Sequence, residues 1–446
     1  MMRLTRLGGY ALAAAAVVLA GVVVPATLGA AQSLTVTRYA GTDRFDTAAQ
    51  VADATFTAPV PVAFIARGDA FADALAGTPA AAVGGGPVLL VESGAIPPAT
   101  AAELTALTPG RIVVLGGPSA VADSVLTALK AYTTGSVTRL AGADRYATAA
   151  AISAATFSPG VGAAYIATDI GFADALAGGA AAGTAKDPIL IVQQAAIPAA
   201  TAQELTRLQP KSIVILGGLA AVSAAVATQQ ATFTTGAVTR VAGADRYATA
   251  VAISQASFPG TAASVYLATG ANFPDALAGG VAAALAPGPL LLTLAACLPP
   301  NVAAEIIRLG ATQVFILGGT SVISAAVDSL TVCALPQAIT ITPSTGLTDG
   351  QVVHVVATGF SPGVQYTALE CADNGGVPAA GDCDVNGVKL ATADAQGTVT
   401  LDYTARKGPF GTNNIVCGPM QKCAIGVAGF APDNTAQAAL EDITFA

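Results

Sequence analysis

The stretch "RLAGADRYATAAAISAATF" at residues 139–157 occurs three times in the chain with few changes. Its copies are "RYAGTDRFDTAAQVADATF" at 38–56 and "RVAGADRYATAVAISQASF" at 240–258. The first arginines of these stretches, Arg38, Arg139 and Arg240, follow one another at intervals of 101 residues. A constant period of this length indicates three copies of a whole domain rather than of a short solenoid unit.

In each copy, short apolar runs alternate with alanine-rich helical stretches. In the second copy, apolar runs of strand length occupy 163–168, 188–192 and 212–218, and helical stretches lie between them. Apolar strands without polar alternation are typical of a parallel sheet that helices cover on both faces. We therefore expect three-layer α/β domains with right-handed crossovers. The expected boundaries of the three copies are 32–135, 136–236 and 237–335.

Residues 1–31 have the pattern of a secretory signal peptide. Arg3 and Arg6 precede an apolar run over 10–24, and small residues follow at 29–31, where cleavage is expected. Without this segment, 17 basic and 27 acidic residues give a net charge of −10, and no basic tract is present. The sequence therefore predicts a secreted protein without a nucleic-acid partner and without a transmembrane span in the mature chain.

Five charged positions recur in every copy, while most other surface charges differ between copies. They are Arg38, Asp43, Arg44, Asp73 and Glu103 in the first copy, Arg139, Asp144, Arg145, Asp174 and Glu204 in the second, and Arg240, Asp245, Arg246, Asp275 and Glu305 in the third.

One interpretation of these positions is structural. Asp43 and its equivalents stand where a helix N-cap belongs. Asp73 and its equivalents stand in the first turn of a helix, where a carboxylate complements the helix dipole. Thr100 with Glu103, and Thr201 with Glu204, have the spacing of a capping box. The arginines would then form ion pairs with these carboxylates.

The alternative interpretation is recognition of a ligand. Guanidinium groups bind phosphates, carboxylates and sugar hydroxyls with defined geometry. Three copies of a weak site would bind a polymer with avidity. An L-G-G motif after a strand, at 115–117, 216–218 and 317–319, forms either a tight turn or a cradle for an anion.

Four motifs together resemble the type 2 cell-wall-binding repeats of Gram-positive bacteria. They are R-x-A-G-x-D-R, F-x-D-A-L-A-G, I/L-P with a later EL or EI, and I/V-L-G-G, over about residues 33–335. The resemblance implies a pseudo-threefold unit that attaches proteins non-covalently to an anionic wall polysaccharide or teichoic-type polymer. The candidate polymer-binding residues are Arg38, Arg44, Arg139, Arg145, Arg240 and Arg246.

From residue 336 the chain consists of short β-rich runs separated by Gly, Pro, Asn and Asp, which predicts an antiparallel sandwich over 336–446. Cysteines of an exported chain are expected in disulfides. Their grouping favours Cys297 with Cys333, Cys371 with Cys383, and Cys417 with Cys423. The first bridge is expected to close the end of the third copy. The single histidine, His354, is expected to point outward.

"TPSTGLTDGQVVHV", "TGFSPG" and the last four cysteines resemble the neocarzinostatin-like apoproteins, which are immunoglobulin-like carriers of enediyne antibiotics. The resemblance spans about residues 338–446. It implies a cleft for a small ligand beside the sandwich, and Tyr366 and Phe410 are the candidates for lining a reduced pocket.

Two functions follow from these observations. The first is a secreted wall-anchored protein that presents a sandwich at the surface, and the second is a surface carrier that sequesters a small apolar molecule. The chain has one histidine, its cysteines are expected to pair, and it shows no cluster of ligand residues. We therefore expect no metal site and no cofactor. An enzyme is not expected, although a glycosidase that uses carboxylates alone stays open.

Overall fold

The computed structural model describes residues 34–70, 75–333, 337–374, 378–394, 396–431 and 436–446. The expected signal peptide at 1–31 lies outside the described residues. The described chain divides into a compact unit that ends at Val332 and a second unit that begins at Cys333. In the described part, no helix is long and apolar enough to cross a membrane.

The three copies in the first unit have the same order of strands and helices. The first copy contains β1 (Thr35–Tyr39), α1 (Arg44–Thr55), β2 (Ala63–Arg67), α2 (Gly77–Gly84), β3 (Val88–Val91), α3 (Pro98–Leu107), β4 (Ile112–Leu115) and α4 (Asp123–Ala128). The second contains β5 (Val137–Leu140), α5 (Arg145–Thr156), β6 (Ala164–Thr168), α6 (Ala173–Ala185), β7 (Ile189–Val192), α7 (Ala199–Leu208), β8 (Ile213–Leu216) and α8 (Ala224–Gln230). The third contains β9 (Val238–Val241), α9 (Arg246–Ser257), β10 (Ser264–Thr269), α10 (Pro274–Leu285), β11 (Leu290–Thr293), α11 (Pro300–Leu309), β12 (Gln313–Leu317) and a short 3-10 helix, η3 (Ala325–Ser329).

The sheets show why these residues form strands. Each sheet has four parallel strands, and its central strands are apolar and almost fully buried because helices cover both faces. The α/β prediction is confirmed for all three copies.

The first strand of each copy pairs with the sheet of the preceding copy. The strand orders are β3-β2-β4-β5, β7-β6-β8-β9 and β11-β10-β12-β1. In the third sheet, Thr35–Tyr39 lies parallel to Gln313–Leu317, so the first strand of the chain completes the last sheet. The boundaries expected at 135/136 and 236/237 therefore separate sequence copies but do not separate sheets.

This pairing also bears on the end of the third copy, which the bridge between Cys297 and Cys333 is expected to close. Cys297 and Cys333 are both disulfide-bonded. However, the edge that another repeat occupies in the first two sheets is already occupied by β1 in the third. The end of the third sheet is therefore closed by strand pairing, which does not depend on a disulfide.

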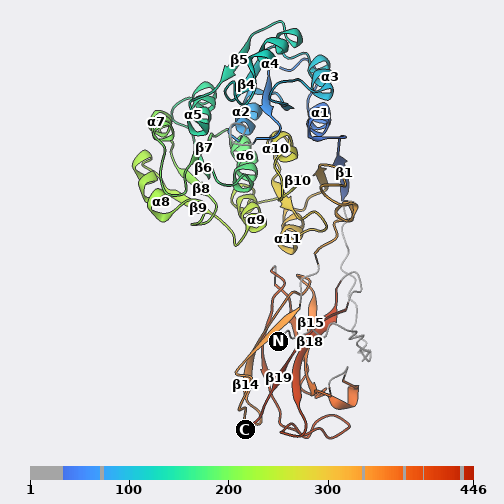
Figure 1. The fold of residues 1–446 in the computed structure, drawn as a ribbon. Helices are drawn as coiled ribbons and strands as arrows, with labels where there is room; N and C mark the ends of the chain where they lie inside the picture. Colours follow the sequence, from blue (N-terminus) through green and yellow to red (C-terminus); the bar gives the residue numbers. More distant parts are fainter. Residues whose placement is uncertain (1–33, 71–74, 334–336, 375–377, 395, 432–435) are drawn as a thin grey trace, which may run out of the picture. The chain divides into compact units, whose positions relative to one another are not determined.

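The helices α2, α6 and α10 pack against one another in the middle of this unit (Figure 1). Small side chains allow their close approach. A Cβ added at Gly183 would lie 2.8 Å from the Cβ of Ala284, and one added at Gly280 would lie 3.0 Å from Thr78 Cγ2. Each central helix also packs on the first helix of the following copy, α2 on α5, α6 on α9 and α10 on α1. The three copies therefore form one closed ring with a shared core.

The second unit is an antiparallel sandwich, as expected. Its strands are β13 (Ala338–Thr342), β14 (Val352–Thr358), β15 (Gln365–Ala372), β16 (Lys389–Thr392), β17 (Val399–Thr404), β18 (Cys423–Phe430) and β19 (Ala436–Ile443). They form a three-stranded sheet, β13-β14-β17, and a four-stranded sheet, β16-β15-β18-β19. Strand alternation sends one set of side chains into the core between them, and Tyr366, Tyr403 and Phe360 are its largest fully buried members.

Disulfides Cys371–Cys383 and Cys417–Cys423 lie in the sandwich, as their grouping predicts. Both link segments close to each other in sequence, with separations of 12 and 6 residues.

Candidate functional site

In the described residues, the arginines and aspartates of the R-x-A-G-x-D-R and F-x-D motifs lie where the parallel strands end, on the carboxyl side of each sheet, whereas the recurring glutamates lie on the third helix of each copy. In open parallel sheets the carboxyl side is the side on which ligands bind. The first strand of each copy joins the sheet of the preceding copy. The R-x-A-G-x-D-R motif, which begins in that strand, therefore lies beside the L-G-G turn of the preceding copy. Each candidate site is therefore built from two consecutive copies, and the third copy is completed by the first.

The first arginine of each motif stabilises the joint between two copies, that is, the place where the first strand of one copy pairs with the sheet of the preceding copy. Arg38, Arg139 and Arg240 each donate from Nη1 to the carbonyl of the first L-G-G glycine, which is Gly318, Gly116 and Gly217 respectively, at 2.7 Å.

Each of these arginines also donates from Nη2 within the protein. Arg139 and Arg240 donate from Nη2 to the carbonyls of Val121 and Val222, at 2.8 and 2.7 Å. Arg38 forms an ion pair with Asp328 at 2.6 Å, and its side chain is 15% exposed. These three arginines, which the sequence suggests as candidates for polymer binding, thus hold the first strand of each copy to the sheet of the preceding copy.

The second arginine of each motif is placed differently. Arg44 donates to the Gly68 carbonyl at 2.8 Å, Arg145 to the Asp169 carbonyl at 3.1 Å, and Arg246 to the Gly270 carbonyl. Arg145 and Arg246 are exposed, and Arg44 is half-buried.

An aromatic ring of the preceding copy completes the surroundings of Arg246. Its guanidinium carbon lies 5.7 Å from the centroid of the Phe172 ring. Phe172 precedes α6, and its ring lies 5.9 Å from that of Phe273, which precedes α10. The surroundings of α6 and α10 are therefore contiguous at this point.

The aspartates of the F-x-D motif face the same turns. Asp174 lies against Gly217 and Asp275 against Gly318, since a Cβ added at either glycine would lie 2.2 or 2.5 Å from an aspartate oxygen. Burial raises the pKa of Asp174, and it raises the pKa of Asp275 to about 6.

The second arginine of the following copy opposes these pKa shifts. The positive charge of Arg246 acts on Asp174, and that of Arg44 acts on Asp275. Arginine and aspartate are thus electrostatically coupled across the joint between copies. The remaining member of this set, Asp73, lies outside the described residues.

The other predicted aspartates cap helices. Asp43 accepts from the amides of Phe45 and Asp46, and Asp144 and Asp245 accept from Ala147 and Ala248. The L-G-G motif is a tight turn, because its first glycine has φ between 92° and 110° in every copy.

The capping boxes expected at Thr100–Glu103 and Thr201–Glu204 do not form. Thr100 and Thr201 donate instead to the carbonyls of Leu90 and Ile191 in the neighbouring strand. The glutamates are buried, and in the second and third copies each is bound by an arginine one turn later, Arg207 or Arg308. The prediction missed these arginines because the first copy has Ala106 at the equivalent position.

Tyr366 and Phe410, the candidates for a ligand pocket in the sandwich, are core residues with 1% and 6% exposure. Tyr366 bonds to Gln437 through its hydroxyl group and packs on Phe360 with 4.7 Å between ring centroids. Strand alternation turns the Tyr366 side chain inward, and Phe410, in an isolated bridge with Ile415, is buried as well, so both belong to the core rather than to the surface. His354 is exposed as expected and pairs with Asp402 at 2.9 Å.

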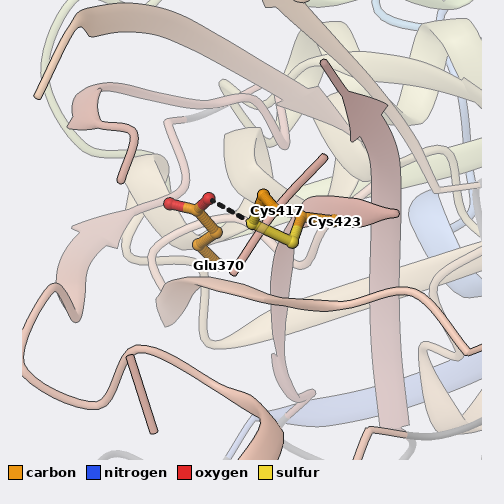
Figure 2. A group of neighbouring side chains, drawn as sticks. All are labelled: Glu370, Cys417 and Cys423. Carbon is orange, nitrogen blue, oxygen red and sulfur yellow. Dashed lines mark hydrogen bonds between the residues drawn. A yellow bond between two sulfur atoms is a disulfide. The ribbon is translucent and has the colours of Figure 1, made fainter. Parts of the chain in front are cut away.

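Glu370, Cys417 and Cys423 place ligand-type atoms within 4.8 Å of one another in the sandwich (Figure 2). The two cysteines form a disulfide, so they offer no thiolates to a metal. The Glu370 carboxylate lies 3.7 Å from Cys417 Sγ and accepts from the Arg406 amide at 2.8 Å. Burial raises the pKa of Glu370 to about 7.

Family models match both units of the chain. The model described as Cell wall binding domain 2 matches residues 38–126, 139–227 and 240–328. The chain belongs to the Cell wall binding domain 2 family. The Neocarzinostatin family model matches residues 339–443.

Similar proteins agree with this division. Cwp6 from Clostridium difficile matches with a TM-score of 0.60 and 26% identity over 68% of this chain and 49% of its own. Macromomycin from Streptomyces macromomyceticus is 34% identical over 115 residues, which cover 24% of this chain and 76% of the relative. The antitumor antibiotic C-1027 apoprotein from Streptomyces globisporus is 31% identical over 105 residues, 24% of this chain and 67% of the relative.

The chain thus spans about half the length of the Cwp6 chain that it matches. Its first unit carries three wall-binding repeats of a family that binds cell-wall polymers, and its second is of neocarzinostatin type. The first point and the similarity to Cwp6 indicate a protein of the cell surface or cell wall.

Proposed function

We propose that this protein is exported by the segment at 1–31 and held non-covalently on a Gram-positive wall by an anionic polymer. The polymer occupies the three joints between copies, and Arg44, Arg145 and Arg246 contact its anionic groups. The sandwich is presented at the surface, and the protein has no catalytic activity of its own.

The placement of Arg246 carries this proposal. Its guanidinium is exposed, lies over the Phe172 ring, and faces a desolvated aspartate across the joint. An exposed guanidinium beside an aromatic ring offers charge-assisted hydrogen bonds to an anionic group and an apolar face to a sugar. With one such arginine at each of the three joints, weak contacts would add up to avidity along a polymer.

The test is a wall-binding titration of the full chain and of the triple variant Arg44→Ala, Arg145→Ala, Arg246→Ala. We expect the variant to bind intact walls at least about tenfold more weakly, because three charge-assisted contacts are lost. Binding of the unchanged protein should fall when the acid-labile polymer is removed from the wall.

A matched control removes three positive charges elsewhere on the same unit, with Arg111→Ala, Lys130→Ala and Lys211→Ala. These side chains are exposed, and Arg111 lies next to the opposite end of its strand. The control should bind as the unchanged protein does. Equal weakening in both triple variants would reduce the effect to net charge, and undiminished binding of the arginine variant would refute the proposed sites.

A second candidate function is carriage of a small apolar molecule by the sandwich. The outward face of the four-stranded sheet exposes Leu390, Phe430 and Leu440. In the middle of this face, Gly426 and Ala428 have little or no side chain, so the face is shallow there. The similar C-1027 protein is described as an apoprotein, which agrees with a carrier role.

An apolar fluorescent dye tests this second function. The full chain should bind the dye with a defined stoichiometry, and Leu390→Lys with Leu440→Lys should reduce its affinity. If the exposed leucines leave dye binding unchanged, this face is not the carrier surface.

A further inference from the structure

The third helix of each copy carries one buried glutamate, and in two copies its partners are complete. In the second copy Arg207 donates to Glu204 from Nε at 2.8 Å and from Nη2 at 2.7 Å. The same Nη2 also donates to the Phe157 carbonyl at 2.8 Å, and Ser153 donates its hydroxyl to the carboxylate. A guanidinium is therefore clamped between a carboxylate and a carbonyl.

The third copy repeats this arrangement. Arg308 donates to Glu305 from Nε and Nη2, both at 2.7 Å, and from Nη2 to the Phe258 carbonyl at 2.8 Å. Ser254 donates to the same carboxylate, and Gln255 adds a contact at 3.3 Å. The position of the cation is thus the same in both copies.

The first copy keeps the acceptors and loses the donors. Glu103 is the equivalent glutamate and Phe56 the equivalent phenylalanine, but Ala52 replaces the serine and Ala106 replaces the arginine. Glu103 is only 8% exposed, and within the described residues its Oε1 has no hydrogen-bond partner. A buried carboxylate oxygen without a partner is costly, so its environment is incomplete as it stands.

A second carboxylate lies close to Glu103. Asp53 stands where the third copy has Gln255, and its negative charge raises the pKa of Glu103 together with the larger effect of burial. Two copies thus balance one carboxylate with one guanidinium, whereas the first has two carboxylates and no cation from the described part of the chain. Ala106 and Asp53 are exposed, so the place of the missing guanidinium is open to water.

We propose that the first copy binds a divalent cation of the calcium class where the other copies place an arginine guanidinium. The protein ligands are the carboxylates of Glu103 and Asp53 and the carbonyl oxygen of Phe56, and water completes the shell. All three are hard oxygen donors, which calcium prefers. With few protein ligands, the dissociation constant should lie at about 10⁻⁴ to 10⁻³ M, as in extracellular calcium modules.

The orphaned carboxyl oxygen sets this site apart from an ordinary group of surface acids. Exposed acidic pairs are solvated and need no ion, whereas Glu103 is more than nine-tenths buried and occupies the position whose equivalents, Glu204 and Glu305, each bind a guanidinium. The internal comparison therefore supplies both the position and the charge of the missing group.

Equilibrium dialysis with radioactive calcium on the full chain tests the site directly. We expect a single ion per chain, with binding half-saturated at about 0.1–1 mM. Calcium should also raise the melting temperature of the protein more than magnesium does at the same concentration, because magnesium demands a stricter octahedral shell.

The decisive variant restores the sister arrangement with Ala52→Ser and Ala106→Arg. It should melt at a higher temperature than the unchanged protein without calcium, and it should bind less than a tenth as much calcium, because its guanidinium occupies the site. Glu103→Gln should also lose calcium binding while remaining folded. The control Thr105→Arg adds the same charge at an exposed neighbouring position of α3 and should keep the calcium site.

Absence of calcium binding by the unchanged chain would overturn the proposal. So would calcium binding that persists in the Ala52→Ser, Ala106→Arg variant. Wall binding plays no part in these readouts, so the proposed anchoring and the cation site fail or succeed separately.

Discussion

At the scale of single residues, Glu370 is a carboxylate that the sandwich holds in an unfavourable place. It is fully buried, lies against the Cys417–Cys423 disulfide, and has the negative charge of Asp384 near it. Burial raises its pKa to about 7, so the folded sandwich binds this proton more tightly than the unfolded chain does. The stability that depends on this proton is complete below pH 4.5 and is lost as the pH rises to about 7.

Glu370→Gln should therefore stabilise the sandwich at pH 8 and have little effect at pH 4. The amide oxygen can still accept from the Arg406 amide, and no charge is buried at high pH. The gain should reach at most about 3.5 kcal/mol, since the pKa rises from 4.5 to about 7 and each pKa unit corresponds to about 1.4 kcal/mol. Urea unfolding followed by NMR signals of Tyr403 measures it, and a difference independent of pH would contradict this explanation.

Single residues also show what the sequence could and could not predict. The N-cap aspartates follow from residue type and position, because capping is local. The two arginines of each motif look equivalent in the sequence. Only the structure shows that Arg139 donates to two backbone carbonyls, whereas Arg145 is exposed. Tyr366 was expected to line a pocket, although strand alternation places it on the same face as Ala368, which is buried.

At the scale of elements, the L-G-G turn links strand geometry to the candidate site. In the second copy Gly217 has φ of 92°, and its missing side chain makes room for the Asp174 carboxylate. The turn therefore needs glycine at this position for two separate reasons. The following glycine, Gly218, has open space around its Cβ position.

Gly217→Ala should destabilise the first unit by about 2 kcal/mol or more, because it combines an unfavourable φ with a contact of 2.2 Å to Asp174. Gly218→Ala is the matched control and should change stability by less than about 0.5 kcal/mol. Thermal unfolding of both variants measures the difference. Equal losses would show that the carboxylate does not determine this turn.

The alternation of strands and helices could be predicted because three copies repeat the same apolar periods. The sequence could not predict which sheet the first strand of each copy joins. A strand at the start of a copy can pair with its own sheet or with the preceding one, and both choices give parallel neighbours. Packing of α2 on α5 and the bond from Arg139 to Gly116 decide between them, and both depend on the folded chain.

At the scale of the whole molecule, the closed ring makes the third sheet depend on the N-terminal strand. Deletion of residues 34–39 should expose the edge of β12, which pairs with β1 along its full length. We expect amide hydrogen exchange in β12 to accelerate strongly, while β4 and β8 keep their protection because β5 and β9 still cover them. Equal protection in all three strands would show that β1 is dispensable.

The same strand sets the order in which a nascent chain can fold. Arg38 and the Gly318 carbonyl that it binds are 280 residues apart. β1 is the first strand of the first unit to be synthesised, and β12 is the last. β1 therefore has no strand partner until nearly the entire first unit has been made. A contact this distant along the chain forms slowly, and it postpones the final compact state. Such a delay would suit the export that we propose, because a chain must be unfolded while it crosses a membrane.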